Sequence, residues 1–201
     1  MSGMSRVGLG RLRSGDISHS DWDRISEAVD CASRLDLHVD DQGALTIDDI
    51  RSKVLGMSPP PKVVILDYLQ LCSGMGEGNR NSELEAVSRG LKSMAMSMDI
   101  LIIALIQLNR EVDRRVGQRP ILSDCRDSGS IEQDGDAICF LRPLRDLTDG
   151  HKLRGFEVAA QRDGPTGDIA LDFDGSHQVF ADSHEPIEQE QERPARRGFA
   201  S

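Results

Sequence analysis

The segment Ser123-Asp-Cys-Arg-Asp-Ser-Gly-Ser-Ile-Glu-Gln-Asp-Gly-Asp-Ala-Ile-Cys-Phe140 changes from polar to apolar within a few residues. Its first part holds Arg126, Asp127 and Gly129, and its end enters the apolar stretch 137–141. A guanidinium binds phosphate through two N–H groups, and a glycine lets backbone amides approach a ligand closely. The segment therefore fits a phosphate-contacting loop before a strand, although an ordinary Asp/Ser/Gly turn is the simpler interpretation of the loop by itself.

Short apolar runs recur on both sides of this segment. Val63–Leu66 follows three prolines that exclude helix, and Leu101–Ile106 is apolar throughout. Further strands are predicted at residues 137–141, 156–160, 169–173 and 178–180. The turn-forming residues 163–167 predict a hairpin at one edge of the sheet. Because these runs alternate with amphipathic helices, the sequence predicts an α/β fold whose sheet is covered on both faces.

A hydroxyl residue followed three positions later by a carboxylate predicts a helix start. This pattern occurs at Ser20 with Asp23, Thr46 with Asp49, and Ser82 with Glu85. The first helix is expected to run to Arg34, with Trp22 and Val29 facing inward. The third carries an apolar stripe that we interpret as core: Leu84, Val87, Leu91, Met94, Ala95 and Met98. Residues 1–181 are expected to form one domain, and the charged residues 182–201 a disordered tail.

Composition restricts the functional classes. The 201-residue chain carries a net charge of −10, which excludes a generally DNA-coating surface. The stretch 110–126 is the exception, since five arginines outnumber three carboxylates there; a solvated loop is the simpler interpretation. No apolar run approaches the roughly 20 residues that span a bilayer. The four cysteines lie far apart, so reduced thiols and a cytoplasmic location are expected rather than zinc or disulfides.

The segment 123–140 closely resembles the signature loop of the DnaB-type replicative DNA helicases, whose motor is a RecA-like ATPase domain. The resemblance extends from about Ser5 to Phe180. It implies a RecA-like sheet flanked by helices, with ATP and Mg²⁺ as cofactors. It also implies single-stranded DNA as a partner, and like subunits in a ring that is a hexamer in the family. By this resemblance Arg126, Asp127 and Gly129 bind the DNA strand, and Asp127 stands where the family usually has Glu.

Three further positions gain a role from the same resemblance. The stretch 64–71 resembles the Walker B strand, so Asp67 would hold Mg²⁺. Gln107 ends the next strand, where it would sense the γ-phosphate. Arg162 resembles the arginine finger that reaches a neighbour's nucleotide; here Ala160 stands where the family has Lys. Without the resemblance these residues are more simply a turn cap, a turn glutamine and a surface arginine.

The phosphate-binding pattern Gly-x-x-x-x-Gly-Lys-Ser/Thr is absent from the 201 residues. The glycine-rich stretch 74–78 has a glutamate and no lysine, so it would repel phosphate. Residues from Ser5 on resemble those that follow both the phosphate loop and the strand with the catalytic glutamate. The resemblance therefore predicts a domain truncated before Ser5, without the phosphate-loop strand and with apolar faces uncovered on the neighbouring strands.

Two interpretations follow from this pattern. The chain is the C-terminal part of a helicase motor for ATP-dependent DNA unwinding in replication and is not catalytic alone. Alternatively, it is a non-catalytic remnant that retains DNA-binding and subunit-binding surfaces. A RecA-like recombination ATPase fits the signature loop less well.

Overall fold

The computed structural model describes residues 1–72, 80–115, 119–125 and 129–187, and it contains two β-sheets. The two-stranded parallel sheet consists of β1 (Val63–Leu66) and β2 (Leu101–Ala104). The four-stranded antiparallel sheet has the order β3 (Ala137–Asp146), β4 (His151–Gln161), β5 (Gly167–Asp174) and β6 (Val179–Asp182). The predicted α/β class and the predicted hairpin between β4 and β5 are therefore confirmed.

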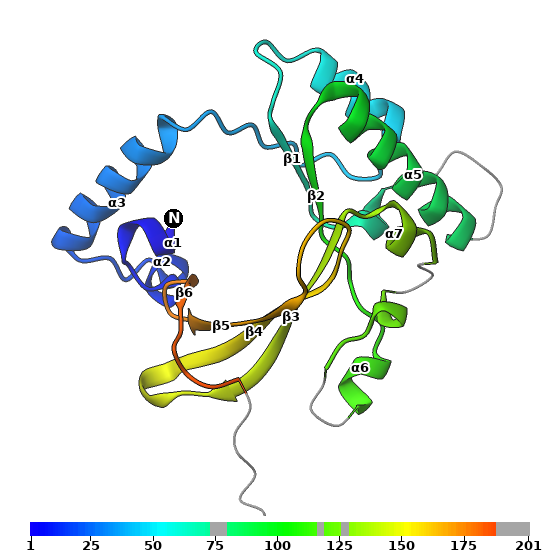
Figure 1. Ribbon diagram of the computed structural model, residues 1–201. Coiled ribbons are helices and arrows are strands. Elements are labelled where there is room, and N and C mark those ends of the chain that lie inside the picture. The colour runs from blue at the N-terminus through cyan, green and yellow to red at the C-terminus, as the bar shows by residue number, and fades with distance from the viewer. Residues whose placement is uncertain (73–79, 116–118, 126–128, 188–201) are drawn as a thin grey trace, which may run out of the picture.

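The helices form two groups. The first consists of α1 (Ser2–Ser5), α2 (Leu9–Ser14) and α3 (His19–Ser33). The second consists of α4 (Ile47–Leu55), α5 (Arg80–Met98), the short α6 (Glu111–Arg114) and α7 (Gly129–Asp134). Figure 1 shows the first group beside β6, and α4, α5 and α7 gathered near β1 and β2. The four-stranded sheet runs between the two groups.

The core lies between α5, α4 and the inner face of the parallel sheet. The predicted stripe of α5 is confirmed there, since Val87 and Met94 are almost fully buried. Val64 and Ile102, one from each strand, pack against this cluster. The start of α4 is also as predicted, because the Thr46 side chain accepts a hydrogen bond from the Asp49 amide and the Asp49 carboxylate accepts one from the Thr46 amide.

The opposite face of the parallel sheet is uncovered, so the prediction of a sheet buried on both faces is wrong for the residues that the structure describes. Val63 pairs with Leu101 and Ile65 with Ile103, and all four side chains project to the same face. Ile65 is 62% exposed and Leu101 is 57% exposed. The separate prediction of uncovered apolar faces on these strands is confirmed.

The N-terminal helices pack against the end of the antiparallel sheet. The Leu9 amide donates to the carbonyl oxygen of Ser176 over 2.7 Å, in the turn between β5 and β6. Gly3 lies against Val179 of β6 so closely that a Cβ at this position would stand 2.9 Å from its Cγ2. A side chain at position 3 would therefore push α1 away from the sheet.

Two predicted helix starts are wrong. The cap of α3 is Ser18 with Asp21, two residues earlier than predicted, and both reciprocal hydrogen bonds are present. This register leaves Trp22 56% exposed and Val29 exposed, while Ala28 is buried. Ser82 lies inside α5, because that helix already begins at Arg80. The Ser82–Glu85 pattern therefore does not mark the start of the helix.

Asp21 explains why the α3 cap forms where it does. Its side chain is almost fully buried, and it accepts hydrogen bonds from the Ser18 hydroxyl and the Ser18 amide. Arg24 and Arg11 also pair with it. The Ser18 hydrogen bonds, followed by the two arginines, lower the pKa of Asp21 from near 4 to about 2.

This pKa predicts an acid-dependent contribution to stability. A carboxylate whose pKa is lowered on folding stabilises the fold above its unfolded pKa and loses that contribution as the pH falls toward its folded pKa. We therefore expect Asp21→Asn to lower the unfolding midpoint at pH 5–7. The difference from wild type should shrink between about pH 4 and pH 2. Urea unfolding of both proteins across this range measures it, and a difference independent of pH would contradict the assignment.

The predicted tail begins too early, because Asp182 belongs to β6 and Arg145 of β3 donates to Glu185 and to the carbonyl oxygen of Pro186. The division into one domain and a tail stays a prediction. β6 ends at Asp182, and residues 188–201 of the predicted tail lie outside the described residues. Across the described part of the chain, none of the helices combines the length and apolar character needed to cross a bilayer.

Candidate functional site

Asp67 and Gln107 lie at the same edge of the parallel sheet. Asp67 directly follows β1, and the backbone ladder continues beyond β2, because the Leu105 amide donates to the carbonyl oxygen of Leu66 over 2.9 Å. The Leu69 amide then donates to the carbonyl oxygen of Leu105 over 2.8 Å. Both candidate side chains are exposed at this carboxyl edge, where open α/β sheets bind ligands.

Gln70 joins the two strand ends, and the sequence did not predict its role. Its side-chain amide donates to the carbonyl oxygen of Gln107 over 3.0 Å and accepts from the Gln107 backbone amide over 3.2 Å. The Gln70 side chain thus links the segment after Asp67 to the segment after β2 through two hydrogen bonds. A polar residue between Leu69 and Leu71 was the available signal, but nothing local indicates a partner 37 positions away.

The residues at this edge fit Mg²⁺ that is bound together with a nucleotide. Mg²⁺ in nucleotide sites is held by one or two carboxylates together with phosphate oxygens and water. Asp67 offers one exposed carboxylate. Within the described residues no group of three His, Cys, Asp or Glu side chains could hold a metal by itself. The donor set therefore fits Mg²⁺ shared with a nucleotide and does not form a cage made by protein alone.

The stem of the predicted DNA loop lies next to this edge. Leu108 forms an antiparallel bridge with Cys125, and the Asn109 amide donates to the carbonyl oxygen of Asp124 over 3.0 Å. Arg126 and Asp127 lie outside the described residues, and Gly129 begins α7. Cys125, the last described residue before the loop, is therefore paired with Leu108, which directly follows Gln107.

Of the four arginines of the basic stretch that the structure describes, Arg115 and Arg119 are engaged in ion pairs. Arg115 donates two hydrogen bonds to the buried carboxylate of Asp124, at 2.6 Å and 3.1 Å. This fork lowers the pKa of Asp124, with the Arg115 hydrogen bond as the largest cause. Arg119 pairs with Glu157 of β4 at 3.0 Å and with Asp168 of β5 at 3.4 Å. Arg115 and Arg119 thus hold neighbouring segments together, which the net charge of the stretch did not indicate.

Arg162 lies at the end of β4 and is not brought to the Asp67 edge by any polar contact. Its backbone amide donates to the carbonyl oxygen of Asp136 over 2.8 Å. Its Nη2 donates to the carbonyl oxygen of Gln133 over 3.2 Å, and its Nε lies 3.3 Å from Asp136 Oδ1. Among the described residues, no hydrogen bond or ion pair joins Arg162 to Asp67 or Gln107.

The α/β fold, with a carboxylate and an amide at the carboxyl edge of a parallel sheet, matches the RecA-like ATPase domain of DnaB-like helicases in the solved structures. A solved ATPase domain superposes with a TM-score of 0.83 and 29% sequence identity, over 90% of this chain and 68% of that chain. A DnaB-like replicative helicase, solved in a study of its interactions with primase, matches with a TM-score of 0.82 and 30% identity. This match covers 89% of this chain and 46% of that chain.

The family follows from the sequence comparison. Residues 1–182 match the model of the DnaB-like helicase C terminal domain, and the chain belongs to this family. The replicative DNA helicase DnaB of Geobacillus stearothermophilus is 34% identical over 192 residues, which cover 91% of this chain and 42% of that protein. The replicative DNA helicase DnaB of Buchnera aphidicola subsp. Baizongia pistaciae is 38% identical over 188 residues, covering 90% and 41%. The chain thus spans about two fifths of these relatives.

Proposed function

We propose that this chain forms the C-terminal part of a replicative helicase motor that moves along single-stranded DNA at the expense of ATP. The observation that carries the proposal is the carboxyl edge of the parallel sheet, where Asp67 directly follows β1, Gln107 lies three residues after β2, and Gln70 joins the two segments. The replicative helicases that match the chain support the reaction class. The four cysteines are free, which fits a cytoplasmic protein.

Each residue has a distinct role in this proposal. Asp67 holds Mg²⁺, which neutralises charge on the phosphates of a bound nucleotide. The Gln107 amide donates to a γ-phosphate oxygen and loses that contact on hydrolysis. Gln70 keeps the Gln107 backbone in place. Because Leu108 is paired with Cys125, a displacement of Gln107 would be carried to the DNA loop that follows.

Arg162 has its role in a neighbouring subunit. A guanidinium that reaches a γ-phosphate across an interface stabilises the charge of the transition state. Such a residue needs no contact with the nucleotide edge of its own chain, and the polar contacts of the Arg162 side chain with Asp136 and Gln133 agree with this assignment. The proposal therefore includes a closed ring of like subunits, a hexamer as in the family.

The DNA-binding part of the proposal predicts a salt-sensitive, sequence-independent interaction. We expect Arg126→Ala to weaken single-strand binding and to lower the slope of log K against log salt by about one phosphate contact. Fluorescence anisotropy with labelled oligonucleotides between low and moderate salt measures both quantities.

The matched control is Arg110→Ala, which removes the same charge from an exposed position in the same basic stretch. If Arg126 binds phosphate directly, its replacement has the larger effect on the slope. Equal binding by wild type and Arg126→Ala at low salt would contradict the assignment.

A second function has a specific observation in its favour. The outer face of β1 and β2 is apolar and exposed. An exposed apolar face suits a module that binds other subunits or segments without catalysing a reaction. Hydrolysis measured with and without a supplied phosphate loop distinguishes this function from the helicase motor.

A further inference from the structure

Arg162 shares its carboxylate partner with a second cation. Asp136 precedes β3, and Lys92 of α5 donates to both of its oxygens, at 2.6 Å each. Arg162 approaches the same carboxylate from the end of β4, with Nε 3.3 Å from Oδ1. Three segments that are remote in sequence therefore meet at one carboxylate.

The two cations do not hold Asp136 equally. Lys92 engages both oxygens at short distance, and its side chain is 26% exposed. Arg162 makes one longer contact with the carboxylate, donates from Nη2 to the carbonyl oxygen of Gln133 over 3.2 Å, and is 55% exposed. The pKa of Asp136 is lowered, and the Lys92 hydrogen bond is the largest cause while Arg162 contributes less. If Arg162 leaves, Asp136 keeps its main partner, so no carboxylate is left without a counter-ion.

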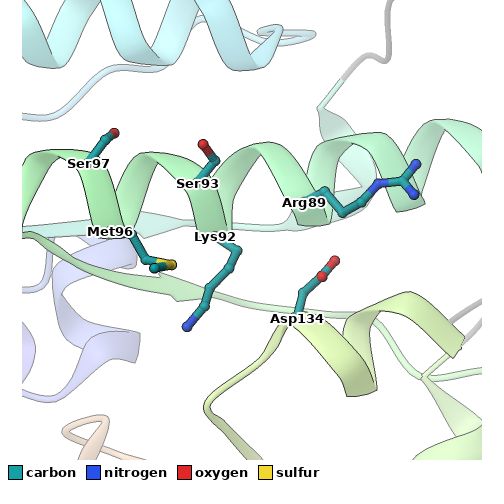
Figure 2. Close-up of a pocket in the computed structure, with 6 residues that line it drawn as sticks. All are labelled: Arg89, Lys92, Ser93, Met96, Ser97 and Asp134. Carbon is teal, nitrogen blue, oxygen red and sulfur yellow. The ribbon is translucent and has the colours of Figure 1, made fainter.

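Lys92, the second partner of Asp136, borders open space. A shallow hollow of about 490 Å³ lies along α5 beside Lys92. It is lined by Arg89, Lys92, Ser93, Met96, Ser97 and Asp134. Figure 2 shows Lys92 leaving α5 on the side of Asp134, whereas Arg89 extends along the helix. Arg162 and Asp136 do not line this hollow, but their side chains are 55% and 63% exposed, so Arg162 can change partner without disrupting the core.

We propose that Asp136 holds Arg162 within its own chain until a polyphosphate displaces it, and that Lys92 weakens this hold by sharing the carboxylate. Asp136 and Lys92 are then positioning residues that set how readily Arg162 reaches a nucleotide on a neighbouring subunit. This inference rests on the proposed role of Arg162. It extends that role by assigning a release mechanism to two residues outside the predicted site.

Tripolyphosphate alone is a suitable probe, because it presents the charge of a nucleotide's phosphates without the base. In arginine-labelled protein, the Arg162 Nε–H signal in ¹⁵N spectra reports the occupancy of this guanidinium. The chain is titrated as wild type, Asp136→Asn, Lys92→Met and the double variant. Asp134→Asn and Arg89→Met are the controls, because each removes the same charge as Asp136→Asn or Lys92→Met from a position on the hollow beside Lys92.

The expected effects have opposite signs. Asp136→Asn removes the competitor and should tighten tripolyphosphate binding at Arg162 roughly two- to fivefold, with a smaller change for Asp134→Asn. Lys92→Met leaves Asp136 to Arg162 alone and should weaken binding by a similar factor. In the Asp136→Asn background, Lys92→Met should do no more than Arg89→Met, because the effect of Lys92 acts through Asp136.

Three results would overturn the inference. Equal effects of Asp136→Asn and Asp134→Asn on tripolyphosphate binding would mean that Asp136 acts only through its charge and not through contact with Arg162. An undiminished Lys92→Met effect in the double variant would mean that Lys92 acts on the anion without Asp136. An Arg162 signal that moves in no variant would show that Asp136 is not what restrains it. All three readouts are independent of ring assembly, so they separate this inference from the finger role itself.

Discussion

The 201-residue chain on its own is expected to show no Mg²⁺-dependent ATP hydrolysis above background. Backbone amides and a lysine of a phosphate loop normally hold the phosphates of the nucleotide. Without them, Asp67 and Gln107 lie at an open edge with no fixed ligand to act on, although Gln70 positions the backbone between them. Phosphate release, measured with purified chain and saturating ATP·Mg²⁺, tests this expectation.

The controls make the result interpretable. A fusion that places a relative's phosphate-loop segment ahead of Met1 is expected to hydrolyse ATP, and Asp67→Ala in the fusion should return it to background. The fused segment would also have to cover the exposed face formed by Val63, Ile65, Leu101 and Ile103. Turnover by the unfused chain that disappears on Asp67→Ala would refute the prediction.

The chain is also expected to suppress a full-length relative's ATPase activity more than in proportion to the amount added. In a closed ring of six, replacing about one subunit in ten leaves roughly half of the rings with at least one fragment. If the sites fire in sequence, one site without a phosphate loop stops its ring. Activity should then fall by about half, whereas independent sites would lose about a tenth. Steady-state hydrolysis at fixed total subunit concentration measures the difference.

Arg162→Ala supplies the matched comparison. The wild-type fragment still offers a finger to its neighbour, so it disables one site, whereas the variant disables two adjacent sites. Size-exclusion chromatography checks that both chains enter the rings to the same extent. Where rings with a dead site retain partial ATPase activity, the variant should then lower that activity more per added chain than the wild type does. A folded, soluble fragment that never enters the ring would defeat the trans model. An aggregating fragment would instead point to the uncovered face of β1 and β2.

Local chemistry alone was enough to predict several elements. The prolines before Val63, the apolar run itself and the Asp67 that ends it all act within a few residues, so strand β1 and its polar end could be predicted. The Thr46–Asp49 cap is equally local, and so is the stripe that buries Met94. The cap of α3 was misplaced because two hydroxyl-carboxylate pairs lie close together. The choice between them depends on how Asp21 is buried and paired with Arg11 and Arg24.

By itself the sequence determined the α/β class, the family resemblance and the positions of Asp67, Gln107 and Arg162 at the ends of their strands. Only the tertiary structure decided which face of the parallel sheet is covered, which arginines are engaged, and that Gln70 contacts Gln107 and Asp136 contacts Arg162. The reason is physical. Periodicity and capping depend on neighbours a few residues apart, whereas a hydrogen bond across 37 positions, or one carboxylate shared by α5 and β4, exists only after the segments have packed.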